Sequence, residues 1–167
     1  MEKPDKIKFL ITGGLIAAVY TATTYALFPI SYGAIQFRIS EALTVLAAIT
    51  PAAIPGLTLG CILSNLGSPL GIVDILVGAL ATLAAASCTY FTRQIKIKGF
   101  PLLCPVFQTV INAVAVGAEM TVVLSKEAAF TGFITYAFSV GIGEFAVCTV
   151  LGIPLYFAFN KYKHLIL

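Results

Sequence analysis

The residues of this chain that could do chemistry are a few polar side chains set in long apolar stretches. Arg38 and Glu41 open one such stretch, just after Phe37, and stand three positions apart. Residues three apart share one face of a helix, so the two side chains are predicted to lie together. A charge near hydrocarbon is costly unless a partner satisfies it. Arg38 and Glu41 therefore either pair only with each other or belong to a polar binding site, and the spacing leaves both open.

Carboxylates and amides recur further along the chain. Gln108, Asn112 and Glu119 follow spacings of four and seven residues, which place them on one helix face. Glu144 has no cation within a helical turn, so a purely structural role is harder to assign to it. The two amides could instead serve as hydrogen-bonding contacts between helices.

Two more candidates border a loop. Asn65 opens the loop that follows one apolar segment, and Asp74 lies in the first turn of the next segment, where it could simply stabilise the helix N-terminus. Carboxylates and amides suit a ligand rich in N–H donors, such as a purine-like base or an amine. Aromatic rings suit a flat heterocycle, and the candidate rings are Tyr32, Phe37, Tyr136 and Phe145.

The composition indicates an integral membrane protein. Of the 167 residues, 59% are hydrophobic and 10% are charged, against about 45–50% and about 25% in soluble domains. The predicted fold class is therefore an all-α membrane protein, a single domain of residues 1–167 embedded in a lipid bilayer. The basic residues form three separate clusters rather than one face, which argues against nucleic acid as a partner.

Several kinds of active site are disfavoured. His164 is the only histidine, which argues against a histidine metal site or catalytic base. There is no phosphate-binding loop of the Gly-x-x-x-x-Gly-Lys-Ser/Thr type, so the chain itself is not expected to hydrolyse ATP. No metal or cofactor is expected. The sequence shows no nucleophile–base pair of the kind that would indicate an enzyme. The cysteines form no Cys-x-x-Cys pair and are predicted to be reduced core thiols: Cys61, Cys88, Cys104 and Cys148.

Basic clusters set the predicted topology. They lie at residues 3–8, 93–98 and 161–163, and cytoplasmic loops are enriched in Lys and Arg. Six crossings put all three clusters and both termini on the cytoplasmic side of the plasma membrane. Gly152 and Pro154 predict a bend in the long last segment. The six helices are predicted at about residues 7–28, 37–50, 52–64, 72–92, 100–124 and 128–160, of which the second and third are short and could form one broken helix.

On this topology the carboxylates within the helices gather in the outer half or the centre of the membrane. That asymmetry predicts a cavity open to the outside and lined by carboxylates and amides. The loop of residues 30–36 would close over the ligand, with Gly33 allowing the movement.

A stripe of small residues runs along the first predicted helix. Its members recur every four positions: Gly14, Ala18, Ala22 and Ala26. Such a stripe lets another helix approach closely inside a membrane. The spacing fits packing within this chain and docking of a separate membrane partner equally well.

Motifs along almost the whole chain fit one known family. They are Phe37-Arg38-Ile39-Ser40-Glu41-Ala42-Leu43-Thr44, the run TPAAIPGL at residues 50–57, Gly60-Cys61, Asn65, Gly71-Ile72-Val73-Asp74, Gly143-Glu144-Phe145 and Gly152-Ile153-Pro154-Leu155. Together they resemble the QueT family, which are substrate-binding S components of energy-coupling factor (ECF) vitamin transporters.

The resemblance implies a six-helix S-component bundle with a pocket near the outer face. That pocket would capture a 7-deazaguanine precursor or salvage form of queuosine, such as queuine. The implied partners are a membrane T component and two ATPases, which alone would use ATP. S components contact the T component through an Ala-x-x-x-Ala motif, which Ala18 and Ala22 match.

A mechanism follows from the resemblance and the residue chemistry together. Glu119 and Glu144 are expected to accept hydrogen bonds from the guanine-like edge or to pair with an aminomethyl group. Gln108 and Asn112 would complete recognition of that edge, and Phe37 and Tyr136 would stack on the ring.

The alternative is a stand-alone or proton-coupled small-molecule permease, in which Glu119 and Glu144 relay protons. An intramembrane enzyme is a third and less supported reading.

Overall fold

A computed structural model describes residues 6–32, 37–124 and 129–163. This part of the chain is helical and contains no β-strand. The helices are α1 (Lys6–Ala26), α2 (Phe28–Ser31), the 3-10 helix η1 (Ile39–Ala48), α3 (Ala53–Asn65), α4 (Ile72–Thr92), α5 (Leu103–Leu124), α6 (Ala129–Val150) and α7 (Gly152–Lys161). The described part of the chain is thus all-helical, which is consistent with the membrane protein that the composition predicts.

Within the described residues, four helical stretches are long and apolar enough to cross a membrane: Lys6–Ala26, Ile72–Thr92, Leu103–Leu124 and Phe130–Lys161. Two shorter apolar helices are η1 and α3. At about 2.0 Å per residue for a 3-10 helix and about 1.5 Å for an α-helix, each is about 20 Å long. A hydrocarbon core is about 30 Å thick, so the two crossings assigned to these segments stay a prediction.

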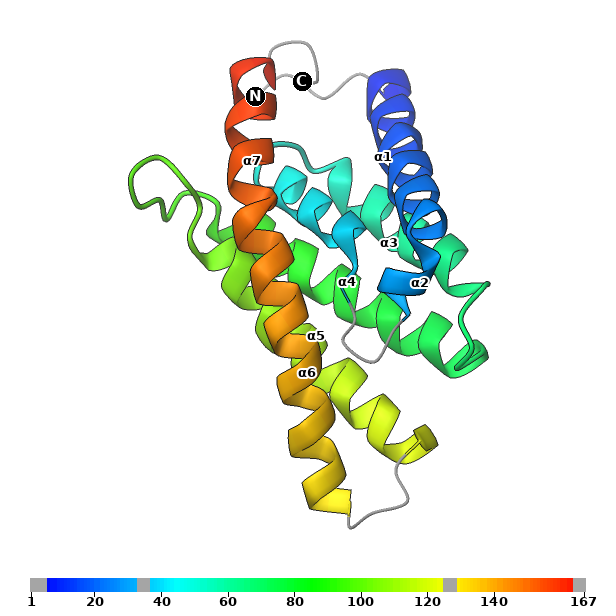
Figure 1. Ribbon diagram of the computed structural model, residues 1–167. Helices are drawn as coiled ribbons and strands as arrows, with labels where there is room; N and C mark the ends of the chain where they lie inside the picture. The colour runs from blue at the N-terminus through cyan, green and yellow to red at the C-terminus, as the bar shows by residue number, and fades with distance from the viewer. Residues whose placement is uncertain (1–5, 33–36, 125–128, 164–167) are drawn as a thin grey trace.

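The short helix η1 lies at the centre of the molecule. It contacts α1, α3, α4, α5, α6 and α7, and Figure 1 shows it (cyan) enclosed between α1 and α7. Most of its side chains are buried, including the polar ones of Ser40, Glu41 and Thr44. The stretch that carries the most polar motif of the sequence therefore forms the interior of the bundle.

The structure corrects the expectation that Arg38 and Glu41 share a helix face. The helix begins at Ile39, not at residue 37, and it has 3-10 geometry. Arg38 precedes it with φ −79° and ψ 88°, outside the helical region. The rule for residues three apart holds only inside a helix, so it does not apply to Arg38 and Glu41.

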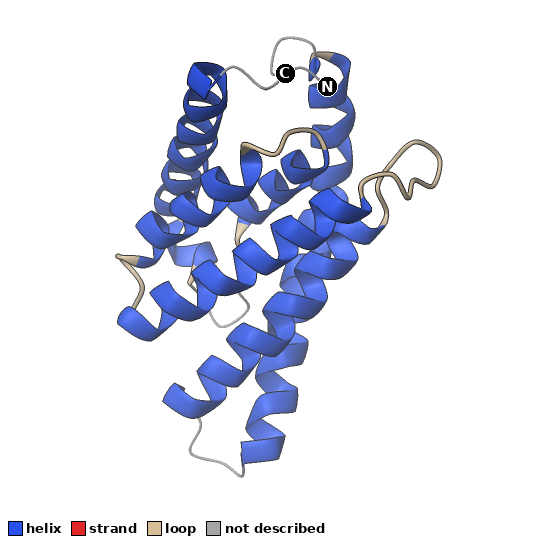
Figure 2. Cartoon of the chain, turned by 180° about the vertical axis from the view of Figure 1, so that it is seen from behind, coloured by secondary structure: helices blue, strands red, loops and turns tan. Residues whose placement is uncertain are grey.

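The last predicted segment is interrupted where its sequence predicts a bend. α6 ends at Val150 and α7 begins at Gly152, and the proline at position 154 has no N–H to continue the earlier helix. The C-terminal end of α7 and the N-terminal end of α1 lie at the same end of the molecule in both views (Figures 1 and 2). On which side of the membrane that end lies stays a prediction.

Helix α1 packs on α3 through one face and leaves another exposed. Its buried face includes Gly13, Ala17 and Tyr20. The helices approach so closely that a Cβ on Gly56 of α3 would lie 2.6 Å from the carbonyl oxygen of Gly13. The predicted small-residue stripe lies on the other face, because all four of its members are exposed: Gly14, Ala18, Ala22 and Ala26. Within the described chain, internal packing does not account for that stripe.

Large apolar side chains cover much of the outer surface. Leu10 is 72% exposed, Phe91 78% and Phe130 77%, and each belongs to a different long helix. Such a surface is unfavourable in water and suits contact with lipid. The polar side chains are inside instead, where they can meet.

Candidate functional site

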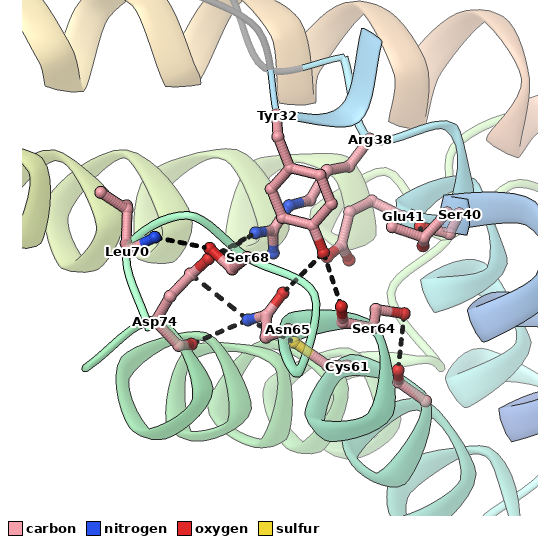
Figure 3. Close-up of polar contacts among 12 residues, drawn as sticks. Tyr32, Arg38, Ser40, Glu41, Cys61, Ser64, Asn65, Ser68, Leu70 and Asp74 are labelled. Carbon is pink, nitrogen blue, oxygen red and sulfur yellow. Dashed lines mark hydrogen bonds and ion pairs between the residues drawn. The ribbon is translucent and has the colours of Figure 1, made fainter. Parts of the chain in front are cut away.

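The first group of buried polar residues is centred on an ion pair. Nη2 of Arg38 lies 3.3 Å from Oδ2 of Asp74, and the two side chains are 5% and 1% exposed. Asn65 joins α3 to this pair, since its Nδ2 donates to the backbone oxygen of Asp74 at 2.7 Å and lies 3.3 Å from Oδ1. Figure 3 shows the three side chains converging from η1, α3 and α4. Asp74 thus does more than stabilise the first turn of α4.

Tyr32 closes one side of this group. Its hydroxyl donates to the backbone oxygen of Ser64 at 2.8 Å and lies 3.3 Å from Oδ1 of Asn65. The Arg38 guanidinium lies over the Tyr32 ring, 5.2 Å from its centre. Burial raises the pKa of Tyr32 to about 12, so the hydroxyl remains a hydrogen-bond donor at neutral pH.

The second group is centred on Glu41. The hydroxyl of Tyr20 donates to Oε1 of Glu41, and Nε2 of Gln108 donates to Oε2 at 2.7 Å. Glu41 is 1% exposed, and Tyr20 and Gln108 are fully buried. Tyr20 is absent from the residues predicted from the sequence, because a tyrosine in an apolar helix looks the same whether it faces a site or a lipid headgroup.

Glu144 lies next to the Glu41 group. The Cys148 thiol is 3.8 Å from Oε2 of Glu144 and 3.6 Å from the backbone oxygen of Glu41. The Asn112 side chain is also close to the Glu144 carboxylate, although its Nδ2 has no hydrogen-bond partner. Glu144 is 4% exposed, so a carboxylate from α6 is held inside the bundle beside η1 and α5.

Several buried polar atoms in these groups lack a hydrogen-bond partner. Both carboxylate oxygens of Glu119 are unpartnered, and the residue is 4% exposed. The charged side chains that act on it electrostatically are those of Asp74 and Arg38. The other unpartnered atoms from predicted site residues are Arg38 Nε, Gln108 Oε1 and Asn112 Nδ2. Such orphaned groups are rare in folded proteins and call for an explanation.

The aromatic residues predicted to wall the site differ from one another in burial and in their neighbours. Phe37 is partly buried. Tyr136 packs against the apolar cluster of Val116, Met120 and Val140. Phe145 is 53% exposed and lines a groove between α5 and α6, so the prediction that it walls the polar site is wrong. The predicted lid is the loop of residues 30–36, of which residues 33–36, with Gly33, lie outside the described residues. Residues 30 and 31 are not loop, as predicted, but the end of helix α2.

A cavity of about 480 Å³ lies between α1, η1 and α7. Its lining is almost entirely apolar and includes Val19, Leu43 and Pro154. None of the predicted substrate-binding residues lines it. Among residues 6–32, 37–124 and 129–163, no three His, Cys, Asp or Glu side chains group as a metal site would require.

Comparison with known proteins gives one family and one similar protein. The family model described as "QueT transporter" matches residues 10–161. A protein of Lactococcus lactis subsp. cremoris (strain MG1363), named "Queuosine precursor transporter QueT", is 40% identical over 87 residues. That alignment covers 51% of this chain and 51% of the relative, so it spans about half the length of each. No solved structure matches the chain.

Proposed function

Because the chain belongs to the QueT transporter family, we propose that it is the substrate-binding S component of an ECF-type importer. Its substrate is a 7-deazaguanine precursor or salvage form of queuosine, such as queuine. The buried polar residues of η1, α3, α4, α5 and α6 form the capture site. The chain itself performs no chemical conversion of the base.

The observation that carries this proposal is the set of unpartnered polar atoms inside the bundle. Four predicted site residues contribute them: Arg38, Gln108, Asn112 and Glu119. Leaving a buried polar group unpaired costs about 1–3 kcal/mol, and more if it is charged. A ligand that supplies the missing partners recovers that free energy, which makes these atoms a source of affinity.

The chemistry of these atoms fits a guanine-like edge. Such a base offers N–H donors and a carbonyl acceptor. Glu119 and Gln108 supply acceptors, while Arg38 Nε and Asn112 Nδ2 supply donors. The charge of Arg38 is already paired with Asp74, so it does not neutralise the other carboxylates of the site. These carboxylates give an excess of acceptors, which suits a donor-rich base or one that carries an aminomethyl cation.

The remaining parts of the site are proposed on the same basis. Phe37 and Tyr136 stack on the ring once the base is bound, and the loop of residues 30–36 closes over it. Glu144 lies beside Asn112 and accepts a hydrogen bond from the same edge. Contacts from several helices then order the ligand-bound state.

The partners are a membrane T component and two ATPases. The exposed face of α1 docks on the T component through Ala18 and Ala22. Both are exposed, as a docking surface requires, and small side chains permit close helix approach in a membrane. Six crossings with both termini on the cytoplasmic side of the plasma membrane complete the proposed topology.

Native mass spectrometry of the purified chain tests the function. A 7-deazaguanine base that co-purifies, or that binds when added, supports the capture role, whereas binding of an unrelated small molecule alone contradicts it. Reconstitution in liposomes then separates the S component from the alternative carrier. Uptake that needs the T component and ATPases is expected, while uptake by this chain alone favours a proton-coupled permease, for which the unpartnered Glu119 carboxylate is a suitable proton acceptor.

A further inference from the structure

Tyr20 is a buried residue to which the proposed function gives no role. It is 0% exposed on α1, and its hydroxyl donates a hydrogen bond to Oε1 of Glu41. Its position depends on a glycine of α3, because a Cβ on Gly60 would lie 2.8 Å from the Cβ of Tyr20. The missing side chain at Gly60 leaves the space through which the phenol reaches η1.

Glu41 connects Tyr20 to α5 through a second hydrogen bond. Its Oε2 accepts a hydrogen bond from Nε2 of Gln108 at 2.7 Å. A carboxylate only accepts hydrogen bonds, so the Gln108 amide must turn its NH2 group toward Glu41. The amide oxygen Oε1 then faces away from Glu41, where it is buried without a partner.

The two donors together fix the carboxylate. Tyr20 occupies one oxygen of Glu41 and Gln108 occupies the other, and the three residues come from α1, η1 and α5. If the phenol hydroxyl were lost, Oε1 of Glu41 would have no donor, and the carboxylate could rotate so that Oε2 no longer faces Gln108. The Gln108 amide could then flip and offer its NH2 group in place of its oxygen.

We propose that Tyr20 is a positioning residue that sets ligand specificity, because it holds Glu41 so that Gln108 presents an acceptor rather than a donor to the base. The inference rests on the proposed function, in which Gln108 contacts the base edge. An acceptor at this point selects a base with an N–H group there. A base without that group leaves Oε1 unpaired, as it is in the ligand-free protein, and so binds without the free energy that the hydrogen bond would contribute.

Tyr20→Phe tests this directly, since it keeps the ring that packs on Gly60 and removes only the hydroxyl. The probes are 7-deazaguanine and 7-deazahypoxanthine, which lacks the 2-amino group, and the measurement is equilibrium binding to the detergent-purified chain. The wild type is expected to prefer 7-deazaguanine by at least about tenfold. Tyr20→Phe is expected to reduce that preference at least about fivefold, an effect that a merely structural hydrogen bond would not have.

Tyr25→Phe is the matched control. Tyr25 lies on the same helix, and its hydroxyl donates to the backbone oxygen of Leu63 in α3 at 3.0 Å. This variant loses a hydroxyl hydrogen bond between α1 and α3 without touching Glu41, so it should keep the wild-type preference. An unchanged preference in Tyr20→Phe, or an equal loss in Tyr25→Phe, overturns the inference and leaves the proposed function standing.

A second variant keeps the inference testable if Tyr20→Phe does not fold. Gln108→Met removes the oriented acceptor at similar side-chain size and should abolish the preference for 7-deazaguanine. A retained preference in Gln108→Met, or a wild type without any preference, overturns the inference. In the double variant, Tyr20→Phe should cause no further loss. A wild-type chain that binds neither probe nor queuine overturns the proposed function as well.

Discussion

Arg38 and Asp74 form a buried ion pair although 36 positions separate them, with Nη2 of Arg38 3.3 Å from Oδ2 of Asp74. The pair joins the start of η1 to the first turn of α4. Arg38 therefore has a partner other than Glu41, and Glu41 is left to accept hydrogen bonds from Tyr20 and Gln108. Through these contacts, polar residues of α1, η1, α4 and α5 are held together inside the bundle.

Asp74→Asn is expected to destabilise the protein by about 3–5 kcal/mol, because it leaves the Arg38 charge buried without a countercharge. The measurement is thermal unfolding of the detergent-purified chain. Lys8→Gln is the control, since that lysine is exposed on α1 and its loss should leave the melting temperature unchanged. The double variant Arg38→Met/Asp74→Leu should regain most of the lost stability, and a double variant no more stable than Asp74→Asn would contradict the pairing.

Glu119→Gln is expected to raise or preserve the melting temperature of the ligand-free protein. Both Glu119 oxygens are buried and unpartnered, so removing the charge relieves an unfavourable burial. Glu41→Gln is the matched control with the opposite expectation. Both Glu41 oxygens accept hydrogen bonds, and an amide there would place an NH2 group against a donor and lower the melting temperature. Equal destabilisation by the two changes would mean that Glu119 is satisfied in the folded protein.

The sequence predicts which polar residues lie inside the bundle better than it predicts which of them pair. Helix α4 has the predicted bounds, and the spacing of Gln108, Asn112 and Glu119 places all three on the buried side of α5. Local periodicity is enough for such expectations. Which side chains pair is decided by tertiary packing, so the contact of Arg38 with Asp74 has no signal in the sequence.

Two other features of the structure could not be predicted from the sequence, for related reasons. Helix η1 contacts six other helices and has 3-10 geometry, but its apolar sequence pattern looks the same as that of an α-helix. Tyr20 reaches Glu41 only because Gly60 of a distant segment carries no side chain. The exposed side of α1, by contrast, follows its four-residue period, as the positions of Ala18 and Ala22 show.

Ala22→Leu is expected to weaken assembly with a T component and leave ligand affinity unchanged. The side chain is exposed on α1, so the larger residue disturbs only a surface at which a second helix must approach closely. The measurement is co-purification with tagged T component and ATPases. Ala84→Leu is the control, because Ala84 is exposed on α4 outside the proposed docking surface. Wild-type yield of the complex with Ala22→Leu would show that the stripe serves another purpose.

Equilibrium binding of queuine and related 7-deazaguanine bases to the purified chain, in the wild type and in Glu144→Gln, tests most directly whether the buried polar interior is a capture site. Thr135→Ala is the control, since Thr135 is exposed on the same helix as Glu144. The expected result is saturable binding by the wild type and by the control. Glu144→Gln should bind at least about tenfold more weakly, a loss of about 1.4 kcal/mol. Equal affinity in Glu144→Gln, or no binding of any of these bases by the wild type, would contradict the assignment.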